Sequence, residues 1–358
     1  MRKRSPTAAP RPASKTVTKT TTKTLAPMEA LSVDTIPTGD TWQYEPKWDG
    51  FRCLATRTGK SVVLQSKSGR PLTRYFPELV DALRALRAER FTLDGEIVVP
   101  QGGGFSFDDL LQRIHPAASR IQKLAHETPA LLIVFDLLDV DGDRIASLPL
   151  AERRPQLDAF AKQNFKKDGR IRLSPATRRL ADARKWLGKV GSALDGIIAK
   201  RTDLPYQHGN RTGMQKIKNY RSADCVVGGF RYNEGTRVVG SLLLGLYDDK
   251  GLLNHVGFTS AIADADKPAL TKKLKPLMGG EGFSGDKPGG PSRWSTKRSA
   301  EWQPLKPKLV IEVCYDHFSG GRFRHGTSIL RWRPDKAPKQ CTMDQVKQKR
   351  AKLMTLLK

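Results

Sequence analysis

The chain is organised around the stretch Glu45-Pro46-Lys47-Trp48-Asp49-Gly50-Phe51-Arg52. The run from Phe51 to Ala55 predicts a buried strand, which places Lys47 just before the rigid edge of a sheet. A lysine amine in such a place can act as a nucleophile when burial and nearby cations depress its pKa. The alternative is a surface lysine beside the turn formed by Asp49 and Gly50.

The charge balance of the chain indicates a polyanionic partner. Its 358 residues include 63 Lys and Arg against 36 Asp and Glu, which gives a formal net charge of +27 and a pI near 10.1. Such a surplus attracts phosphate backbones. A membrane surface would attract it as well, but the sequence has no apolar run long enough to span a bilayer and no secretory signal. We therefore expect no membrane partner.

The four cysteines, Cys53, Cys225, Cys314 and Cys341, lie far apart in the sequence and include no Cys-x-x-Cys pair. This spacing argues against a zinc ribbon and against a disulfide framework. We expect a reduced, intracellular protein.

The first part of the chain reads as a basic arm followed by a mixed domain. Residues 1–27 have no hydrophobic period and predict a disordered basic tail. Residues 28–221 predict one domain rich in strands. The expected strands are 61–65, 92–99, 131–138, 194–200 and 214–218, and the expected helices are 77–90, 108–115, 117–126, 150–163 and 177–190. The almost wholly apolar run 131–138 is typical of a strand buried on both faces.

The second part predicts a small barrel. Expected strands at 225–231, 238–247, 252–258 and 309–315, with one helix near 264–277, indicate an OB-like barrel over 222–345, a fold suited to nucleic acid. A basic amphipathic C-terminal helix is expected over 346–358.

Further charged segments follow Lys-x-Asp-Gly-x-Arg at ordered spacing. They are Ser66 to Arg70, Asp94-Gly95-Glu96, Phe135, Asp195-Gly196, Lys216-Ile217-Lys218 and Arg331 to Lys336. Together they resemble the motif series of the covalent nucleotidyltransferases, which comprise DNA ligases, RNA ligases and mRNA-capping enzymes. The resemblance covers residues 28–345, and it is most detailed for the short bacterial ATP-dependent DNA ligases of the LigC type. It implies an α+β fold, in which an adenylation domain with antiparallel sheets and flanking helices precedes an OB-fold β-barrel.

The resemblance also assigns roles to residues. Lys47 would take up AMP. The other ATP-binding residues would be Glu45, Arg52, Arg70, Glu96, Phe135, Lys200, Lys216, Lys218, Arg331, Arg333 and Lys336. Glu96 and Asp195 would hold Mg²⁺, with Mn²⁺ as a possible substitute, although the family usually has Glu where this chain has Asp195. Taken singly, Phe135 is equally a core residue and each carboxylate equally a turn acid.

The residue types suit this chemistry independently of the resemblance. Lys216 and Lys218 lie two apart on a predicted strand and point the same way, so both can flank one phosphate. Their charges would also depress the pKa of Lys47 by like-charge repulsion.

The sequence therefore predicts an ATP-dependent DNA ligase that seals nicked double-stranded DNA, acts as a monomer and serves DNA repair in the bacterial cytoplasm, near the nucleoid. An RNA ligase or a GTP-using capping enzyme is the nearest alternative. A non-catalytic basic DNA-binding protein is the alternative from another class.

Overall fold

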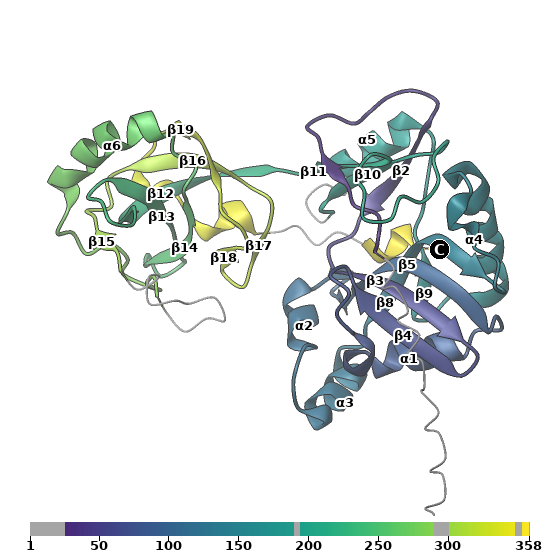
Figure 1. Ribbon diagram of the computed structural model, residues 1–358. Helices are drawn as coiled ribbons and strands as arrows, with labels where there is room; N and C mark the ends of the chain where they lie inside the picture. The colour runs from purple at the N-terminus through teal and green to yellow at the C-terminus, as the bar shows by residue number, and fades with distance from the viewer. Residues whose placement is uncertain (1–25, 190–193, 290–300, 348–352, 358) are drawn as a thin grey trace, which may run out of the picture.

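The computed structural model describes residues 26–189, 194–289, 301–347 and 353–357. Their helices and strands form two groups that meet at residues 219 and 220 (Figure 1). We call residues 26–218 the first domain and residues 221–347 the second domain. No helix among the described residues is long and apolar enough to cross a membrane. Short 3₁₀ turns cover Thr73–Tyr75, Ile145–Ser147, Asp264–Asp266, Lys275–Leu277, Pro338–Gln340, Met343–Val346 and Leu353–Leu356.

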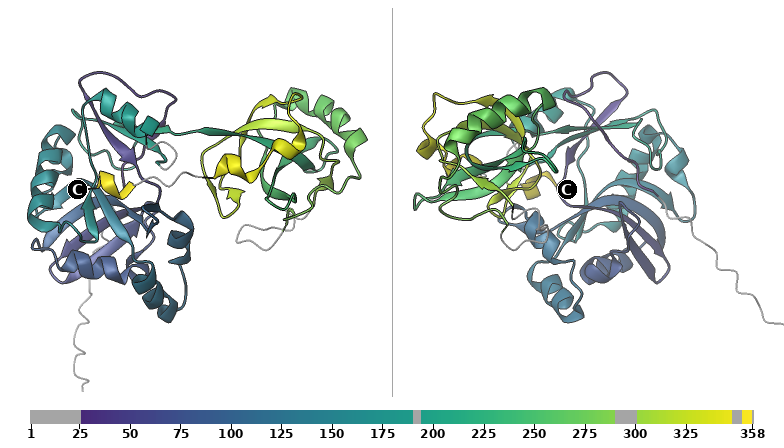
Figure 2. Two further views of the ribbon diagram at one scale, coloured as in Figure 1. Left: turned by 180° about the vertical axis from the view of Figure 1, so that it is seen from behind. Right: turned by 60° about the vertical axis from the view of Figure 1, so that its left-hand side comes forward.

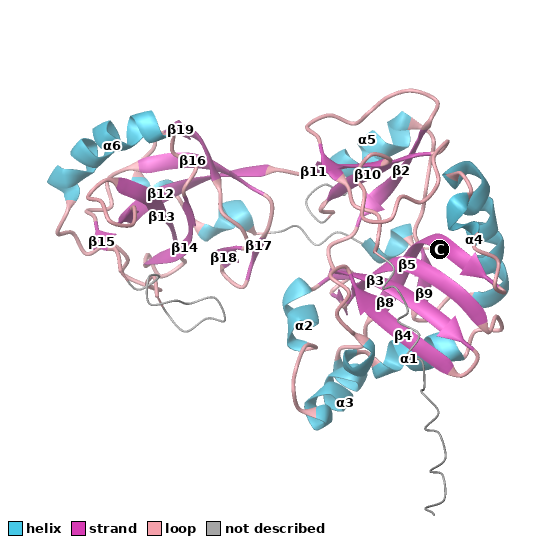
Figure 3. Cartoon of the chain, in the orientation of Figure 1, coloured by secondary structure: helices cyan, strands magenta, loops and turns pink. Residues whose placement is uncertain are grey.

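Two sheets build the first domain (Figure 3). The larger has the order β4 (Ser61–Ser66), β3 (Phe51–Thr58), β5 (Arg90–Val98), β8 (Leu131–Val140) and β9 (Ile171–Leu173). The smaller has the order β1 (Leu31–Ser32), β11 (Met214–Lys218), β10 (Gly196–Arg201) and β2 (Trp42–Lys47). Pairing is antiparallel except between β8 and β9 and between β1 and β11. The predicted antiparallel sheets are thus confirmed, with these two parallel edge pairs added.

Helices flank the sheets of the first domain. They are α1 (Pro77–Arg84), α2 (Phe107–Gln112), α3 (Ala118–Glu127), α4 (Leu150–Asn164) and α5 (Leu180–Lys189), and a hairpin joins β6 (Pro100–Gln101) to β7 (Gly104–Phe105). Helix α1 is shorter than predicted because its buried residues end at Leu83 and the chain then turns into β5. Strand β8 is buried over its first eight residues, as the apolar run 131–138 predicts.

The second domain is a barrel of short strands. Its order is β14 (Leu253–Thr259), β13 (Val239–Tyr247), β12 (Arg221–Tyr232), β16 (Val310–Tyr315) and β19 (Ser328–Trp332). A bridge between Thr259 and Thr327 joins the two ends of this order and closes the barrel. Helix α6 (Lys267–Leu274) and three short strands, β15 (Gln303–Pro304), β17 (Phe318–Ser319) and β18 (Arg322–Phe323), complete the domain. Five strands and one inserted helix confirm the predicted OB-like barrel.

The predicted C-terminal basic helix does not match the described residues. Two separate 3₁₀ turns, Met343–Val346 and Leu353–Leu356, stand in its place, and residues 348–352 and 358 lie outside the described residues. Val346 packs in the core of the second domain, whereas Leu353 packs beside Trp48 in the first domain. These two turns therefore pack in the cores of different domains, and Figure 2 shows the turn Leu353–Leu356, in yellow, beside the first domain.

Candidate active site

The turn after β2 sets the position of Lys47. Lys47 is the last residue of β2 and pairs in register with Gly196 of β10. Trp48 is buried and donates its indole N–H to the Ser174 hydroxyl at 2.9 Å. A Cβ at Gly50 would lie 2.1 Å from the carbonyl oxygen of Ile97, so only glycine lets this turn pass from one sheet to the other. The amine is therefore fixed between the two sheets.

Asp195 is the direct partner of Lys47. The Lys47 ammonium contacts one carboxylate oxygen of Asp195, which is buried at the start of β10. The next residue, Gly196, has a φ of +143°, and a Cβ there would lie 1.9 Å from the Ile217 carbonyl oxygen. Glycine at this place lets β10 and β11 approach closely, so that Gly196 lies between Lys218 of β11 and Lys47 of β2.

Burial lowers the pKa of the Lys47 amine. Glu96 and Asp49 oppose this shift, and the charges of Lys218 and Lys216 add to it. The lysine pair therefore acts in the predicted direction, but burial is the larger cause. Burial also raises the pKa of Glu96 to about 7, against the opposing charges of Arg52 and Lys47. Burial thus favours the neutral form of both groups.

A cavity of ≈ 270 Å³ opens beside Lys47 in the first domain. Most of the predicted nucleotide-binding residues border it, namely Glu45, Lys47, Arg52, Glu96, Phe135, Lys200 and Lys216. Lys67 and Arg211, which no motif singled out, also border the cavity, and both pair with Glu29, at 3.2 and 3.1 Å. Their only signal in the sequence was their charge.

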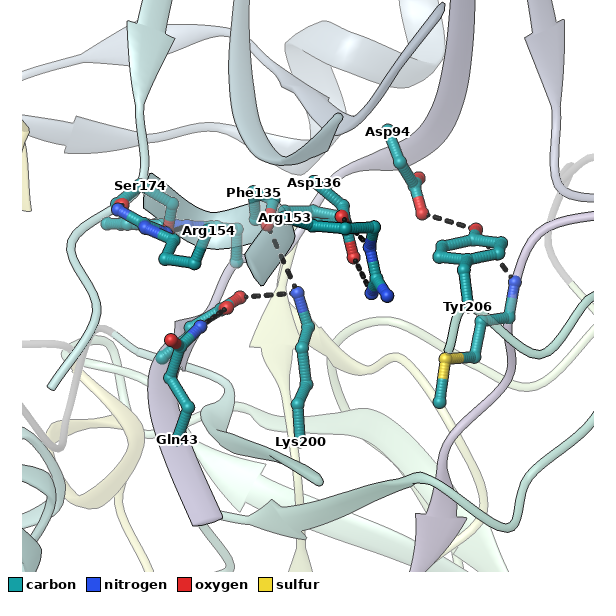
Figure 4. Close-up of polar contacts among 12 residues, drawn as sticks. Gln43, Asp94, Phe135, Asp136, Arg153, Arg154, Ser174, Lys200 and Tyr206 are labelled. Carbon is teal, nitrogen blue, oxygen red and sulfur yellow. Dashed lines mark hydrogen bonds and ion pairs between the residues drawn. The ribbon is translucent and has the colours of Figure 1, made fainter. Parts of the chain in front are cut away.

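A buried ion pair closes one end of this cavity. The Lys200 ammonium lies 2.8 Å from a Glu45 carboxylate oxygen, and the two side chains are 6% and 2% exposed. Lys200 also donates to the Phe135 carbonyl at 3.3 Å, as Figure 4 shows, and Gln43 donates to Glu45 at 2.8 Å. These contacts fix both side chains, so the pair presents a defined polar surface to a ligand.

Arg52 is anchored beside the Phe135 ring. Its guanidinium donates twice to Asp94, at 2.5 and 2.6 Å, and Tyr206 donates to the same carboxylate at 2.6 Å (Figure 4). The Arg52 guanidinium carbon lies 4.6 Å from the centroid of the Phe135 ring, and the Lys200 ammonium lies 4.5 Å from it. Phe135 thus carries two cations on its π-system.

The structure does not bring every predicted site residue to this cavity. Arg70 is exposed on the turn after β4, and Lys67 of the same turn borders the cavity instead. Arg331 pairs with Glu312 at 2.7 Å, and Arg333 and Lys336 pair with Asp224 at 2.8 and 2.6 Å. The predicted edge of cations in the second domain therefore contacts acids of its own domain.

Other residues of the second domain contact the acids near Lys47. His317 lies 2.9 Å through Nε2 from Asp195, and Arg324 donates to both oxygens of Asp49 at 2.8 and 2.9 Å. Burial lowers the pKa of His317 to about 4, so the neutral ring donates from Nε2 to Asp195. No local pattern in the sequence marked His317 or Arg324, because their partners lie more than a hundred residues away.

These contacts enclose a second cavity on the other side of Lys47. It measures ≈ 240 Å³, and both domains line it, with Lys47 and Asp49 from the first and Arg221, His317 and Arg324 from the second. Lys47 therefore borders two cavities, one within the first domain and one between the domains.

Asp195 also belongs to a group of side chains that could hold a metal ion. Its carboxylate, that of Asp49 and the ring of His317 place ligand atoms within 4.8 Å of one another. Glu96, the other predicted metal ligand, does not belong to this group. The two predicted metal ligands therefore do not both belong to this group.

Comparisons with known proteins agree with this arrangement. The family model described as ATP dependent DNA ligase domain matches residues 16–218, and the model described as ATP dependent DNA ligase C terminal region matches residues 235–336. The chain is 42% identical over 337 residues to DNA ligase C of Mycobacterium tuberculosis, an alignment that covers 90% of this chain and 93% of that protein.

Two further similarities are weaker. A Mycobacterium tuberculosis protein named multifunctional non-homologous end joining DNA repair protein LigD is 31% identical over 306 residues, which cover 84% of this chain and 37% of that protein. A solved structure from a study of Lig E DNA ligases has the same fold, with a TM-score of 0.54 at 14% identity over 86% of this chain and 100% of that chain. The two family models and the 42% identity decide the matter: this chain belongs to the ATP-dependent DNA ligase family.

Proposed function

We propose that this protein is an ATP-dependent DNA ligase that seals nicks between a 3′-hydroxyl and a 5′-phosphate. The reaction passes through lysyl-AMP on Lys47 and then through a DNA-adenylate. The observation that carries the proposal is the position of the Lys47 amine between two cavities, one within the first domain and one between the domains. An amine in that place can take a nucleotide from the first cavity and pass it to an acceptor in the second.

ATP would occupy the ≈ 270 Å³ cavity. The buried pair of Glu45 and Lys200 offers a carboxylate and an ammonium to the edge of adenine. The adenine would stack on the Phe135 ring, and the cation on that face has to move aside to admit it. Lys216, on the strand that leads to Lys218, would face the phosphates.

The donors around Lys47 suit a hard divalent cation. We assign Mg²⁺, or Mn²⁺ in its place, to the carboxylates of Glu96 and Asp195, since such ions prefer a few carboxylates completed by waters and phosphates. Glu96 is a half-buried acid with a pKa of about 7, and a neighbouring cation would stabilise its ionised form. When bound, the ion draws charge from phosphate oxygens.

The residues of this chain supply the rest of the first step. The Lys47 amine attacks the α-phosphate only in its neutral form, and burial, which lowers its pKa, favours that form. The contact with Asp195 favours the ammonium instead, so it must be released before attack. Lys216 and Lys218 present fixed positive charge to the oxygens on which charge develops.

The cations Arg331, Arg333 and Lys336 would act in another orientation of the second domain. In the present orientation they pair with Glu312 and Asp224 and do not border the ATP cavity. We propose that the domain turns about the segment near residue 221, brings this edge over the β- and γ-phosphates, and turns back after pyrophosphate leaves.

The partner of the lysyl-AMP form would be nicked double-stranded DNA. The net charge of +27 supports a phosphate backbone as the ligand. We propose that the protein acts as a monomer and serves DNA repair, and the 31% identity to a protein named for end-joining repair supports that setting.

Incubation of the purified protein with α-labelled ATP and Mg²⁺, followed by a denaturing gel, tests the proposal. The wild-type chain should carry label, and Lys47→Ala should carry none while it still binds DNA. Lys60→Ala, which removes an exposed lysine on the turn between β3 and β4, is the matched control and should label normally. Label on Lys47→Ala would show that the nucleophile is another residue.

The alternatives give different results in the same assay. An RNA ligase would label with ATP but seal nicked RNA in preference to nicked DNA, and a capping enzyme would label with GTP. A non-catalytic binding protein would take up no nucleotide and would bind DNA with a steep salt dependence.

A further inference from the structure

The β17–β18 hairpin of the second domain covers one side of the nucleophile. Its flanking residues form three polar contacts with the first domain, each with a group that surrounds Lys47. Asp316 accepts from Lys218 at 2.8 Å, His317 lies 2.9 Å from Asp195, and Arg324 is bonded to Asp49. His317 is only 8% exposed, so the domain boundary buries it.

The charges of these contacts disfavour ATP in this orientation. The Asp316 carboxylate holds Lys218, one of the lysines assigned to the phosphates, and its negative charge would repel a triphosphate there. The cations Arg331 and Arg333 meanwhile remain paired within the second domain. This orientation is therefore suited to a stage at which the triphosphate has gone.

The contact between Asp195 and Lys47 also indicates a stage at which the triphosphate has gone. An acid beside the amine opposes attack, because attack needs the neutral amine. The same acid assists departure, because the amine leaves lysyl-AMP as an ammonium that Asp195 stabilises. His317 donates to the other oxygen of Asp195 and so directs the first oxygen at the amine.

We propose that His317 is a positioning residue for the transfer of AMP from Lys47 to the 5′-phosphate of the nick. In this step the bond between phosphorus and the Lys47 nitrogen breaks, and a bond forms between phosphorus and an oxygen of the 5′-phosphate. The departing nitrogen, which carries one hydrogen in lysyl-AMP, takes two protons from solvent and becomes the ammonium that Asp195 holds. The inference rests on the proposed ligase function and assigns this orientation of the second domain to one step of it.

The test separates AMP transfer from adduct formation. Purified lysyl-AMP enzyme is mixed in a single turnover with nicked DNA whose 3′ end lacks its hydroxyl, so that DNA-adenylate accumulates and sealing cannot follow. For His317→Ala we expect the rate of AMP transfer to fall about tenfold, as for the loss of a residue that orients a catalytic ligand. The rate at which the free enzyme labels with ATP should stay unchanged.

Conservative and control variants make the result specific. His317→Gln can place an amide N–H near the position of Nε2 and should restore most of the transfer rate. Arg324→Met, which breaks the Asp49 contact of the same hairpin, should also slow transfer and leave labelling unchanged. His126→Ala, at an exposed position on α3, should change neither rate.

Three outcomes would overturn the inference: transfer at the wild-type rate in His317→Ala, an equal loss in labelling and transfer, or no rescue by His317→Gln. Each of them leaves the ligase function standing as long as the wild-type chain labels and seals. Absence of label on the wild-type chain would instead refute the proposed function.

Discussion

Replacing Lys200 by methionine should destabilise the first domain strongly. Lys200 and Glu45 form an ion pair with an N to O distance of 2.8 Å, and their side chains are 6% and 2% exposed. Methionine fills a similar volume but leaves the Glu45 carboxylate buried, with the amide of Gln43 as its remaining side-chain donor in Figure 4. The perturbation therefore creates an uncompensated buried charge.

The expected loss follows from that burial. Removing one partner of a buried pair costs about 3 to 5 kcal/mol, whereas replacing both partners by neutral groups costs far less. We therefore expect Lys200→Met to lower the free energy of unfolding by about 3 kcal/mol. The double variant Glu45→Gln with Lys200→Met, which has no buried charge, should be the more stable of the two.

Equilibrium urea unfolding followed by circular dichroism measures both effects. With a urea dependence of about 2 kcal/mol per molar, the midpoint of Lys200→Met should fall by about 1.5 M. Lys185→Met is the matched control, because Lys185 is 63% exposed and its ion pair with Asp182 contributes little. An unchanged midpoint in Lys200→Met, or a double variant less stable than Lys200→Met, would refute the reasoning.

Two further predictions concern pH. Burial lowers the pKa of His255 in the second domain to about 3, which is below its value of about 6.5 in the unfolded chain. The contribution of His255 to stability is therefore present above about pH 6.5 and is lost as the pH falls toward 3. At pH 5 this loss is about 2 kcal/mol. The free energy of unfolding, measured at pH 7 and pH 5, should show the loss in the wild-type chain but not in His255→Leu. An equal pH dependence in both proteins would contradict the prediction. Lys216→Met removes a charge that lowers the pKa of Lys47, so the rising limb of the pH profile for adduct formation should move to higher pH. A limb that stays in place would mean that burial alone sets that pKa.

Local sequence patterns were sufficient to predict those elements whose structure depends mainly on their own residues. The apolar run 131–138 predicted the buried part of β8, because a strand covered on both faces needs apolar side chains at every position. The motif around Lys47 was equally recognisable in the sequence, because the turn leaves no space for a side chain at Gly50.

Local patterns failed where the outcome depended on packing between distant segments. The basic C-terminal residues were predicted to form a helix, but Leu353 packs on the first domain and Val346 on the second. The lowered pKa of Lys47 was predicted from burial and nearby cations together, but only the fold shows that burial contributes more than the lysines.

By itself, the sequence determined the candidate nucleophile, the order of the two domains and the kind of partner, because each follows from residue type, spacing or net charge. Only the tertiary structure decided that Asp195 contacts Lys47, that His317 and Arg324 reach the same place, and that Arg333 and Lys336 face Asp224 instead. The physical reason is that an ion pair requires two side chains within a few ångströms of each other. When the partners lie on different domains, their distance depends on how the domains pack, and no local period or motif encodes that.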